Sequence, residues 1–190
     1  MVKNKYFKDL EYKLLEKKTA YRGKRIVVEE LIYLNGQQKI YREHVLAGDA
    51  AVVLAITEEN DVIMIQEPRT PIKKVILGLP AGMIEPGEEP KQGAIRELQE
   101  ETGYLAQDLT LMRVVYPTVG YSNERTFIYL AKNLKKTERN LDETEDINVI
   151  KIPLSEIRKM LDENEIITAS TTIALMSYFM YYEKSDETVS

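Results

Sequence analysis

The sequence predicts an α/β fold of the α+β type: an α/β/α sandwich with a mixed sheet, preceded by a small antiparallel β unit. Three observations predict it. A hairpin signal lies early in the chain, short apolar runs of strand length fill its middle, and helical segments stand both among those runs and at the end. Elements in this order suit a sheet that is covered by helices on both faces. We expect residues 1–48 to form the N-terminal β unit and residues 49–190 to form the main domain.

The N-terminal β unit is predicted from two strand-like segments, residues 24–33 and 38–45. Asn35-Gly36 stands between them, and this dipeptide is a strong hairpin signal because both residue types tolerate the positive φ of a tight turn. We therefore expect the two segments to pair antiparallel.

The main domain is predicted to begin with a buried strand at residues 50–56. A helix is expected at 90–103, because Pro90 suits a first helical position and Gly103 suits the position just past a C-terminus. Two later helices are expected, each with a serine near its start. The remaining expected elements are strands at 61–67, 75–79, 111–116, 125–131 and 147–152 and helices at 154–161 and 170–182.

Composition narrows the class of protein. With 190 residues, 44% of them hydrophobic, the chain can bury the core of one domain with an elaboration. A net charge of −5 gives no electrostatic reason to expect a nucleic-acid polymer as partner. The longest apolar run, 50–56, is too short to span a bilayer and the first residues lack an apolar signal core, so we expect a cytoplasmic protein with no membrane partner. The lack of cysteine excludes disulfides, thiolate metal sites and cysteine nucleophiles.

Three glutamates of the central helix carry the main functional signal. At about 100° per residue, Glu97, Glu100 and Glu101 fall within roughly a 100° arc. Like charges repel there, at the helix end where the macrodipole also disfavours anions. A hard dication such as Mg²⁺ would join them, and Arg96, one turn before Glu100, can hold a carboxylate in place. The alternative is an acidic, solvated helix face.

The spacing of these residues matches a known pattern. Gly82-Met83-Ile84-Glu85-Pro86-Gly87-Glu88 is followed by Arg96-Glu97-Leu98-Gln99-Glu100-Glu101-Thr102-Gly103. The two segments resemble the Nudix box at every charged and glycine position. Further short segments occur in the order seen in the ADP-ribose pyrophosphatase branch of the Nudix hydrolases: 50–53, 66–69, 79–82, 120–124 and 141–146.

This resemblance implies a metal site and a set of catalytic residues. The implied ligands are Glu97, Glu101 and the backbone carbonyl of Ala81, with Glu100 close by. Glu143 and Glu145 would complete the site, Glu143 as the base and Glu145 as a ligand, although the two roles could be exchanged. Glu100 and Arg96 join Glu143 in the catalytic group. Two or three Mg²⁺ ions are implied, with Mn²⁺ as a substitute. The alternative for residues 132–146 is a solvated surface loop.

The resemblance also implies residues that bind the substrate. Arg69 would reach its phosphates, as a bidentate guanidinium suits; the alternative is a surface salt bridge after an edge strand. Glu124 would contact the terminal ribose or a metal-bound water. Tyr21 or Arg22 could stack on the base, as aromatic and guanidinium planes do, although these two residues could equally be packing. Arg42 is a further candidate for binding the substrate. A homodimer formed through the N-terminal strands is expected from the same resemblance.

The implied activity is hydrolysis of the pyrophosphate bond of ADP-ribose to AMP and ribose 5-phosphate. One departure bears on this substrate: the loop after the box reads Tyr116-Pro117-Thr118-Val119-Gly120, which displaces the proline of the branch by two positions. A broader hydrolase of nucleoside diphosphate sugars such as GDP-mannose or ADP-glucose is the alternative enzyme. A sensor that binds a nucleotide sugar without cleaving it is the third hypothesis, and the presence of all three box glutamates disfavours it.

Overall fold

The computed structural model describes residues 5–141 and 145–183 and divides into two compact units. The N-terminal unit comprises the chain up to Ala47 together with Thr118–Glu124, and the main unit comprises the rest. Within the described ranges, no helix combines the length and apolar character needed to cross a bilayer.

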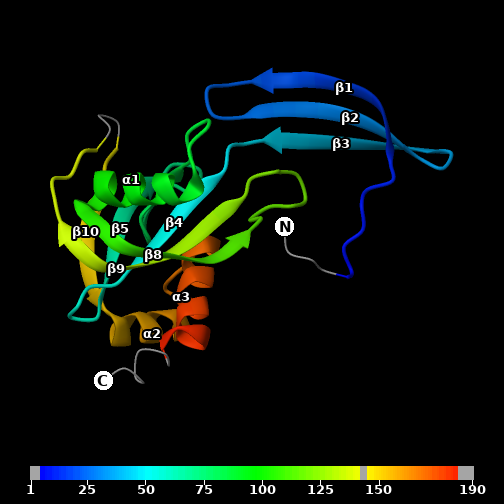
Figure 1. Ribbon diagram of the computed structural model, residues 1–190. Coiled ribbons are helices and arrows are strands. Elements are labelled where there is room, and N and C mark those ends of the chain that lie inside the picture. The colour runs from blue at the N-terminus through cyan, green and yellow to red at the C-terminus, as the bar shows by residue number, and fades with distance from the viewer. Residues whose placement is uncertain (1–4, 142–144, 184–190) are drawn as a thin grey trace. The chain divides into compact units, whose positions relative to one another are not determined.

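The N-terminal unit is a three-stranded antiparallel sheet in the order β1-β2-β3 (Figure 1). Its strands are β1 (Lys13–Arg22), β2 (Val27–Asn35) and β3 (Gln38–Leu46). The predicted hairpin is confirmed: Asn35 pairs with Gln38, and Gly36 in the turn has a φ of 60°. The segment Thr118–Glu124 attaches to β3, because Val45 donates its N–H to the Tyr121 carbonyl at 2.7 Å.

The main unit contains two sheets. A four-stranded mixed sheet has the order β7-β4-β9-β8, in which only β4 and β9 run parallel, and a three-stranded antiparallel sheet has the order β10-β5-β6. The strands are β4 (Ala50–Ala55), β5 (Asp61–Arg69), β6 (Lys74–Gly78), β7 (Ala81–Met83), β8 (Tyr104–Val115), β9 (Thr126–Lys136) and β10 (Asn148–Pro153).

The predicted sandwich is confirmed by the alternation of side chains along β4. Val52 and Leu54 pack in one core cluster with residues of α2 (Leu154–Asp162) and α3 (Ala169–Tyr181). Ala51 and Val53 pack in a second cluster with Ala94 and Leu98 of α1 (Pro90–Thr102). Because successive strand residues point to opposite faces, α1 covers one face of the main unit and α2 with α3 the other (Figure 1).

Some elements differ from the expectation. β7 was not predicted, because a three-residue strand carries no periodicity and is defined by its pairing with β4. β8 begins at Tyr104, directly after the helix, where polar residues interrupt the apolar pattern. β5, which ends at Arg69, lies between β10 and β6, so the alternative of a surface salt bridge after an edge strand is wrong about the strand. Strand position is set by partners far along the chain, which one segment does not encode.

Candidate active site

The central helix α1 carries the box glutamates and ends where the sequence predicted. Pro90 is its first residue, and Gly103 follows it in the left-handed conformation, with a φ of 72°, and donates its N–H to the Gln99 carbonyl at 2.8 Å. Ala94 and Leu98 are fully buried against the mixed sheet. The next stripe of the helix, which bears the glutamates, contacts β7.

Two of the three box glutamates are buried rather than solvated. Glu97 is 9% exposed and Glu101 only 3% exposed, whereas Glu100 is partly exposed. An acidic solvated face is therefore excluded for Glu97 and Glu101. Burying a charged carboxylate is costly unless a partner compensates it, so the burial calls for cations or hydrogen-bond donors at this place.

Gly82 makes room for one of these carboxylates. A Cβ atom built on Gly82 would lie 2.1 Å from the carboxyl carbon of Glu97, a distance that no real contact adopts. The side chain of Glu97 thus occupies the space that any other residue at position 82 would fill. A larger residue at position 82 would therefore displace the Glu97 carboxylate from its place beside the backbone of β7.

Arg96 holds three glutamates together. Its Nε and Nη2 donate to the two carboxylate oxygens of Glu88, each at 3.0 Å. Its Nη1 donates to Glu97 at 2.8 Å and to Glu100 at 2.9 Å, and its Nη2 also donates to the Met83 carbonyl at 2.9 Å. These charge-assisted bonds hold the pKa of Glu88 below its usual value. The predicted role of Arg96 in placing a carboxylate agrees with this geometry.

Glu101 is the most strongly perturbed group. Burial raises its pKa to about 8, partly opposed by a hydrogen bond from the Ala81 N–H at 2.9 Å. The charges of Glu97, Glu67 and Glu145 raise it further. Burial also raises the pKa of Glu97 and of Glu67. The negative charges of Glu97, Glu67 and Glu145 therefore all disfavour the ionised form of Glu101, which itself lies against the backbone of Ala81.

Of the two predicted loop glutamates, only Glu145 lies among the described residues. Glu145 is exposed, and its charge raises the pKa values of Glu97 and Glu101. Glu143 lies outside the described residues, so its role as a base stays a prediction. Among the residues that are described, no three acidic or histidine side chains form a ready-made metal centre. In this arrangement Arg96 donates hydrogen bonds to the carboxylates of Glu97 and Glu100.

Arg69, the predicted phosphate ligand, forms an ion pair with Glu67. The two residues stand two positions apart on β5 and so share one face of the strand. The Arg69 side chain is 48% exposed, whereas that of Glu67 is 18% exposed. The guanidinium of Arg69 therefore lies beside the carboxylate of Glu67.

The sequence pattern of the NUDIX domain matches residues 47–171, most of the main unit. The chain belongs to the Nudix family. The resemblance seen in the sequence to these hydrolases is thereby confirmed.

Two relatives match this Nudix protein over most of its length. The ADP-ribose pyrophosphatase of Bacillus subtilis (strain 168) is 38% identical over 172 residues, 88% of this chain and 92% of that protein. The methanol dehydrogenase activator of Bacillus methanolicus is 36% identical over 172 residues, 86% of this chain and 92% of that protein. A crystal structure of an ADP compounds hydrolase, 24% identical, has a TM-score of 0.83 and covers 94% of this chain and 98% of that chain, which shows the fold.

The donor set of this Nudix protein fits a hard divalent cation. Glu97, Glu101 and Glu145 offer carboxylate oxygens, and Ala81 adds a backbone carbonyl, the oxygen ligands that Mg²⁺ prefers. The close approach of Glu97 to Gly82 and the burial of Glu101 place the carboxylates of these two residues where water cannot solvate them freely. A cation would relieve their mutual repulsion.

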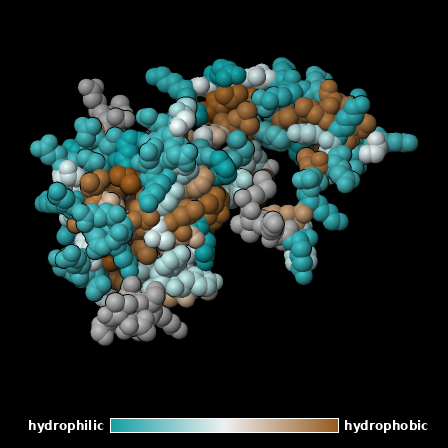
Figure 2. Space-filling model, viewed as in Figure 1, coloured by the Kyte–Doolittle hydropathy of each residue, from teal (hydrophilic) through white to brown (hydrophobic). Residues whose placement is uncertain are grey.

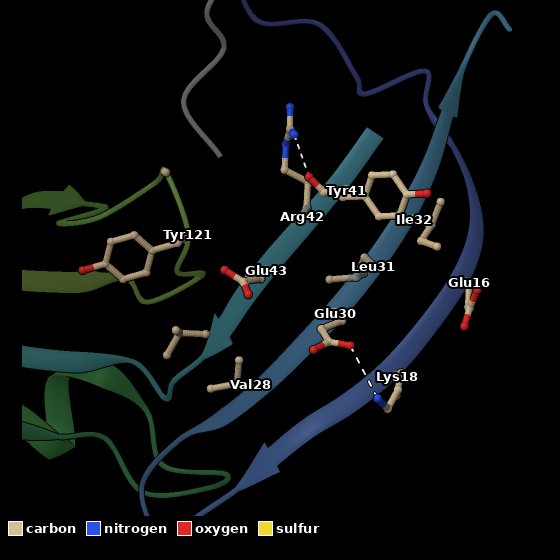
Figure 3. Close-up of a pocket in the computed structure, with 12 residues that line it drawn as sticks. Glu16, Lys18, Val28, Glu30, Leu31, Ile32, Tyr41, Arg42, Glu43 and Tyr121 are labelled. Carbon is tan, nitrogen blue, oxygen red and sulfur yellow. Dashed lines mark hydrogen bonds and ion pairs between the residues drawn. The ribbon is translucent and has the colours of Figure 1, made fainter. Parts of the chain in front are cut away.

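The N-terminal unit of the Nudix protein contains a hollow of about 850 Å³ (Figure 3). Tyr41, Arg42 and Tyr121 line it, together with Lys18 and Glu30, which form an ion pair at 3.6 Å. Arg42, a predicted substrate-binding residue, donates from Nη1 to the Tyr41 carbonyl at 2.8 Å. The hollow thus offers aromatic surface within one unit, whereas the Arg42 guanidinium turns back to the β3 backbone.

The other predicted substrate residues do not line this hollow. Tyr21 and Arg22 lie at the end of β1, where Tyr21 is 58% exposed. Glu124 is partly buried at the end of the segment that joins β3, and its N–H bonds to Ser122 Oγ at 3.2 Å. The roles of these residues stay predictions.

Sequence reasoning missed two residues of the site. Glu67 lies within a segment that resembles the branch, but nothing in a single sequence tells that it joins Glu101 and Glu145. Arg139 lies in a charged stretch with no periodicity, yet it bonds the end of α1. In both cases the signal is a contact between segments far apart in sequence, which a helical or strand pattern cannot reveal.

Proposed function

We propose that this Nudix hydrolase cleaves the pyrophosphate bond of ADP-ribose to give AMP and ribose 5-phosphate, with two or three Mg²⁺ ions that Mn²⁺ can replace. The observation that carries the proposal is the burial of Glu97 and Glu101 beside the backbone of Ala81 and Gly82. The name of the Bacillus subtilis relative, which matches 88% of this chain, supports ADP-ribose as the substrate.

The proposed metal ligands are Glu97, Glu101, Glu145 and the carbonyl of Ala81. Divalent cations bound there would neutralise the diphosphate and lower the pKa of a water molecule, which is the chemistry that hydrolysis at phosphorus requires. Arg96 orients two of the box carboxylates through its hydrogen bonds to Glu97 and Glu100. A cation bound there would compete with Arg96 for the oxygens of these two carboxylates.

Proton transfer and phosphate binding fall to other side chains. Glu143 would accept the proton of the attacking water, a role that a carboxylate within hydrogen-bond reach performs. Arg69 would exchange its ion pair with Glu67 for a bidentate contact with the substrate diphosphate. The adjoining negative charges of the cluster keep this guanidinium near the place where the phosphates would be held. Glu124 would contact the terminal ribose.

The N-terminal unit is proposed to bind the adenine base and to form a homodimer. Tyr41 and Tyr121 offer stacking surface in the hollow, and Arg42, Tyr21 and Arg22 are further candidates for binding the substrate. Every residue of β1 is exposed in the single chain, and Figure 2 shows apolar groups exposed among the charged ones of this sheet. An exposed edge strand with apolar side chains favours a second copy as its cover. The proposed setting is the cytoplasm, in keeping with a chain without cysteine.

A product assay tests the proposed activity. The full-length protein is incubated with Mg²⁺ and, separately, ADP-ribose, GDP-mannose, ADP-glucose, a dinucleoside polyphosphate and NADH, and the products are separated by chromatography. AMP and ribose 5-phosphate from ADP-ribose at the highest kcat/KM is the expected result. A preference for GDP-mannose or ADP-glucose would support the broader hydrolase, and tight binding of one compound without turnover of any would sink the enzyme proposal. Light scattering after gel filtration tests the dimer.

A further inference from the structure

The C-terminal end of α1 is capped by a segment that is distant in sequence. The last carbonyls of a helix have no partner within it and need donors from elsewhere. Thr137 donates its N–H to the Gly103 carbonyl at 2.8 Å, and Asn140 donates its N–H to the Glu100 carbonyl at 3.2 Å. Arg139 completes this set, because its Nε donates to the Glu101 carbonyl at 2.5 Å.

Arg139 has a second backbone partner beyond the acidic loop. Its Nη2 donates to the carbonyl of Ile147 at 2.5 Å, just before β10 begins. One planar guanidinium therefore bridges α1 and the start of β10. Ile147 is two residues past Glu145, so the two Cα atoms are at most about 7 Å apart along the chain. Arg139 thus holds the backbone at two places, at Glu101 in α1 and at Ile147, two residues past Glu145.

The charge of Arg139 also suits its position. α1 has no basic residue in its last turn, although a cation there offsets the negative end of the macrodipole. Arg139 supplies that cation from 38 positions along the chain. A lysine would provide the same charge, but its ammonium group lacks the rigid fork that reaches two carbonyls in fixed directions.

We propose that Arg139 is a positioning residue, which sets the separation of Glu101 and Glu145 by bridging the backbone carbonyls of Glu101 and Ile147. The proposal rests on the proposed function, because it assigns both glutamates to the metal site. Arg139 touches neither substrate nor metal in it and acts through the two carbonyls. Residues that orient metal ligands in this way typically contribute about 10- to 100-fold to metal affinity or activity.

The test compares Arg139→Ala and Arg139→Lys with wild type and with a matched control, Arg158→Ala. Arg158 is also an arginine of the main unit, but it pairs with Glu183 and stacks on Phe179 at 4.1 Å. Two quantities are measured for each protein: the affinity for Mn²⁺ without substrate, by calorimetry, and the split between kcat and KM for ADP-ribose with Mg²⁺.

The direction of the Mn²⁺ result separates positioning from simple electrostatics. Loss of a positive charge beside an acidic cluster would by itself tighten Mn²⁺ binding, whereas loss of the bridge lets the ligands move apart and weakens it. We expect Arg139→Ala to weaken Mn²⁺ binding about 10-fold and to lower kcat about 10-fold with KM within about twofold. Arg139→Lys should fall between Arg139→Ala and wild type, and Arg158→Ala should match wild type.

Wild-type Mn²⁺ affinity and kcat in both Arg139 variants, or tighter Mn²⁺ binding in either, would overturn the proposal. If Arg139→Ala does not fold, as judged by circular dichroism, Arg139→Lys decides by the same criteria. The proposed function fails separately, when the wild-type protein turns over no substrate of the panel. The Mn²⁺ titration then still tests the bridge.

Discussion

Glu101→Gln is the substitution for which the structure makes the sharpest statement. Glutamine keeps the shape of the side chain and can still accept the Ala81 N–H, but it cannot ionise. In the folded protein burial raises the pKa of Glu101 to about 8, from an ordinary value of 4.5. A carboxyl with a raised pKa holds its proton more tightly when folded than when unfolded. The stability that it contributes is complete below pH 4.5 and is lost as the pH rises through about 8.

The magnitude follows from this window. Within the range between the unfolded and folded pKa values of Glu101, each unit of pH changes the folding free energy by about 1.4 kcal/mol. Between about pH 5 and pH 7 the metal-free wild type should therefore lose about 2 to 3 kcal/mol through Glu101, and Glu101→Gln should not. The variant is accordingly expected to be the more stable protein near neutral pH and to have lost most of its activity.

Urea unfolding at pH 5 and pH 7 in the presence of a chelator measures the effect. Glu100→Gln is the matched control, because it makes the same change one residue earlier, at a partly exposed side chain. The pH-dependent loss should be smaller in Glu101→Gln than in wild type and in the control. Added Mg²⁺ should stabilise wild type at pH 7 far more than Glu101→Gln. An equal pH-dependent loss in wild type and Glu101→Gln would refute the reasoning, as would wild-type turnover in that variant.

Three further predictions concern the same site. Arg96→Lys removes the fork that holds Glu88 and its neighbours, so kcat/KM for AMP release should fall about 10- to 100-fold, and an unchanged value would show that the fork is dispensable. Gly82→Ala brings a methyl group into the space of the Glu97 carboxylate, so Mn²⁺ affinity in calorimetry should fall at least about 10-fold with an unchanged circular dichroism spectrum. Glu143→Gln should lower kcat about 100-fold with nearly normal KM in steady-state kinetics, and a change confined to KM would place the base elsewhere.

The sequence was sufficient to show which residues share one face of α1, but not whether that face is buried or exposed. A period of 3.6 residues places Glu97 and Glu101 on one stripe, and the capping residues Pro90 and Gly103 give its ends. Whether that stripe faces solvent or protein depends on what packs beside it. β7 does so here, and a strand of three residues has no signature of its own. The burial that excludes a solvated face for Glu97 and Glu101 therefore had to come from the structure.

The same limit explains which site residues could be found. Glu97, Glu100 and Glu101 lie within one helical turn, so local geometry is enough to group them. Glu67 and Arg139 interact with Glu101 from other segments. Such contacts depend on the order of the strands and the path of the loops. The hairpin at Gly36 was predictable for the opposite reason, because its turn is closed by neighbours in sequence.

The spacing of residues in the box allows specific contacts between them in the folded protein. Gly82 and Glu97 lie fifteen positions apart because the carboxylate of one fills the place of a side chain on the other. Glu88 and Arg96 lie eight positions apart because two parallel hydrogen bonds join them across the turn before the helix. A change in the length of this turn would keep every residue type and still break both contacts. The arrangement of the glutamates therefore depends on the backbone between Gly82 and Arg96 as well as on the glutamates themselves.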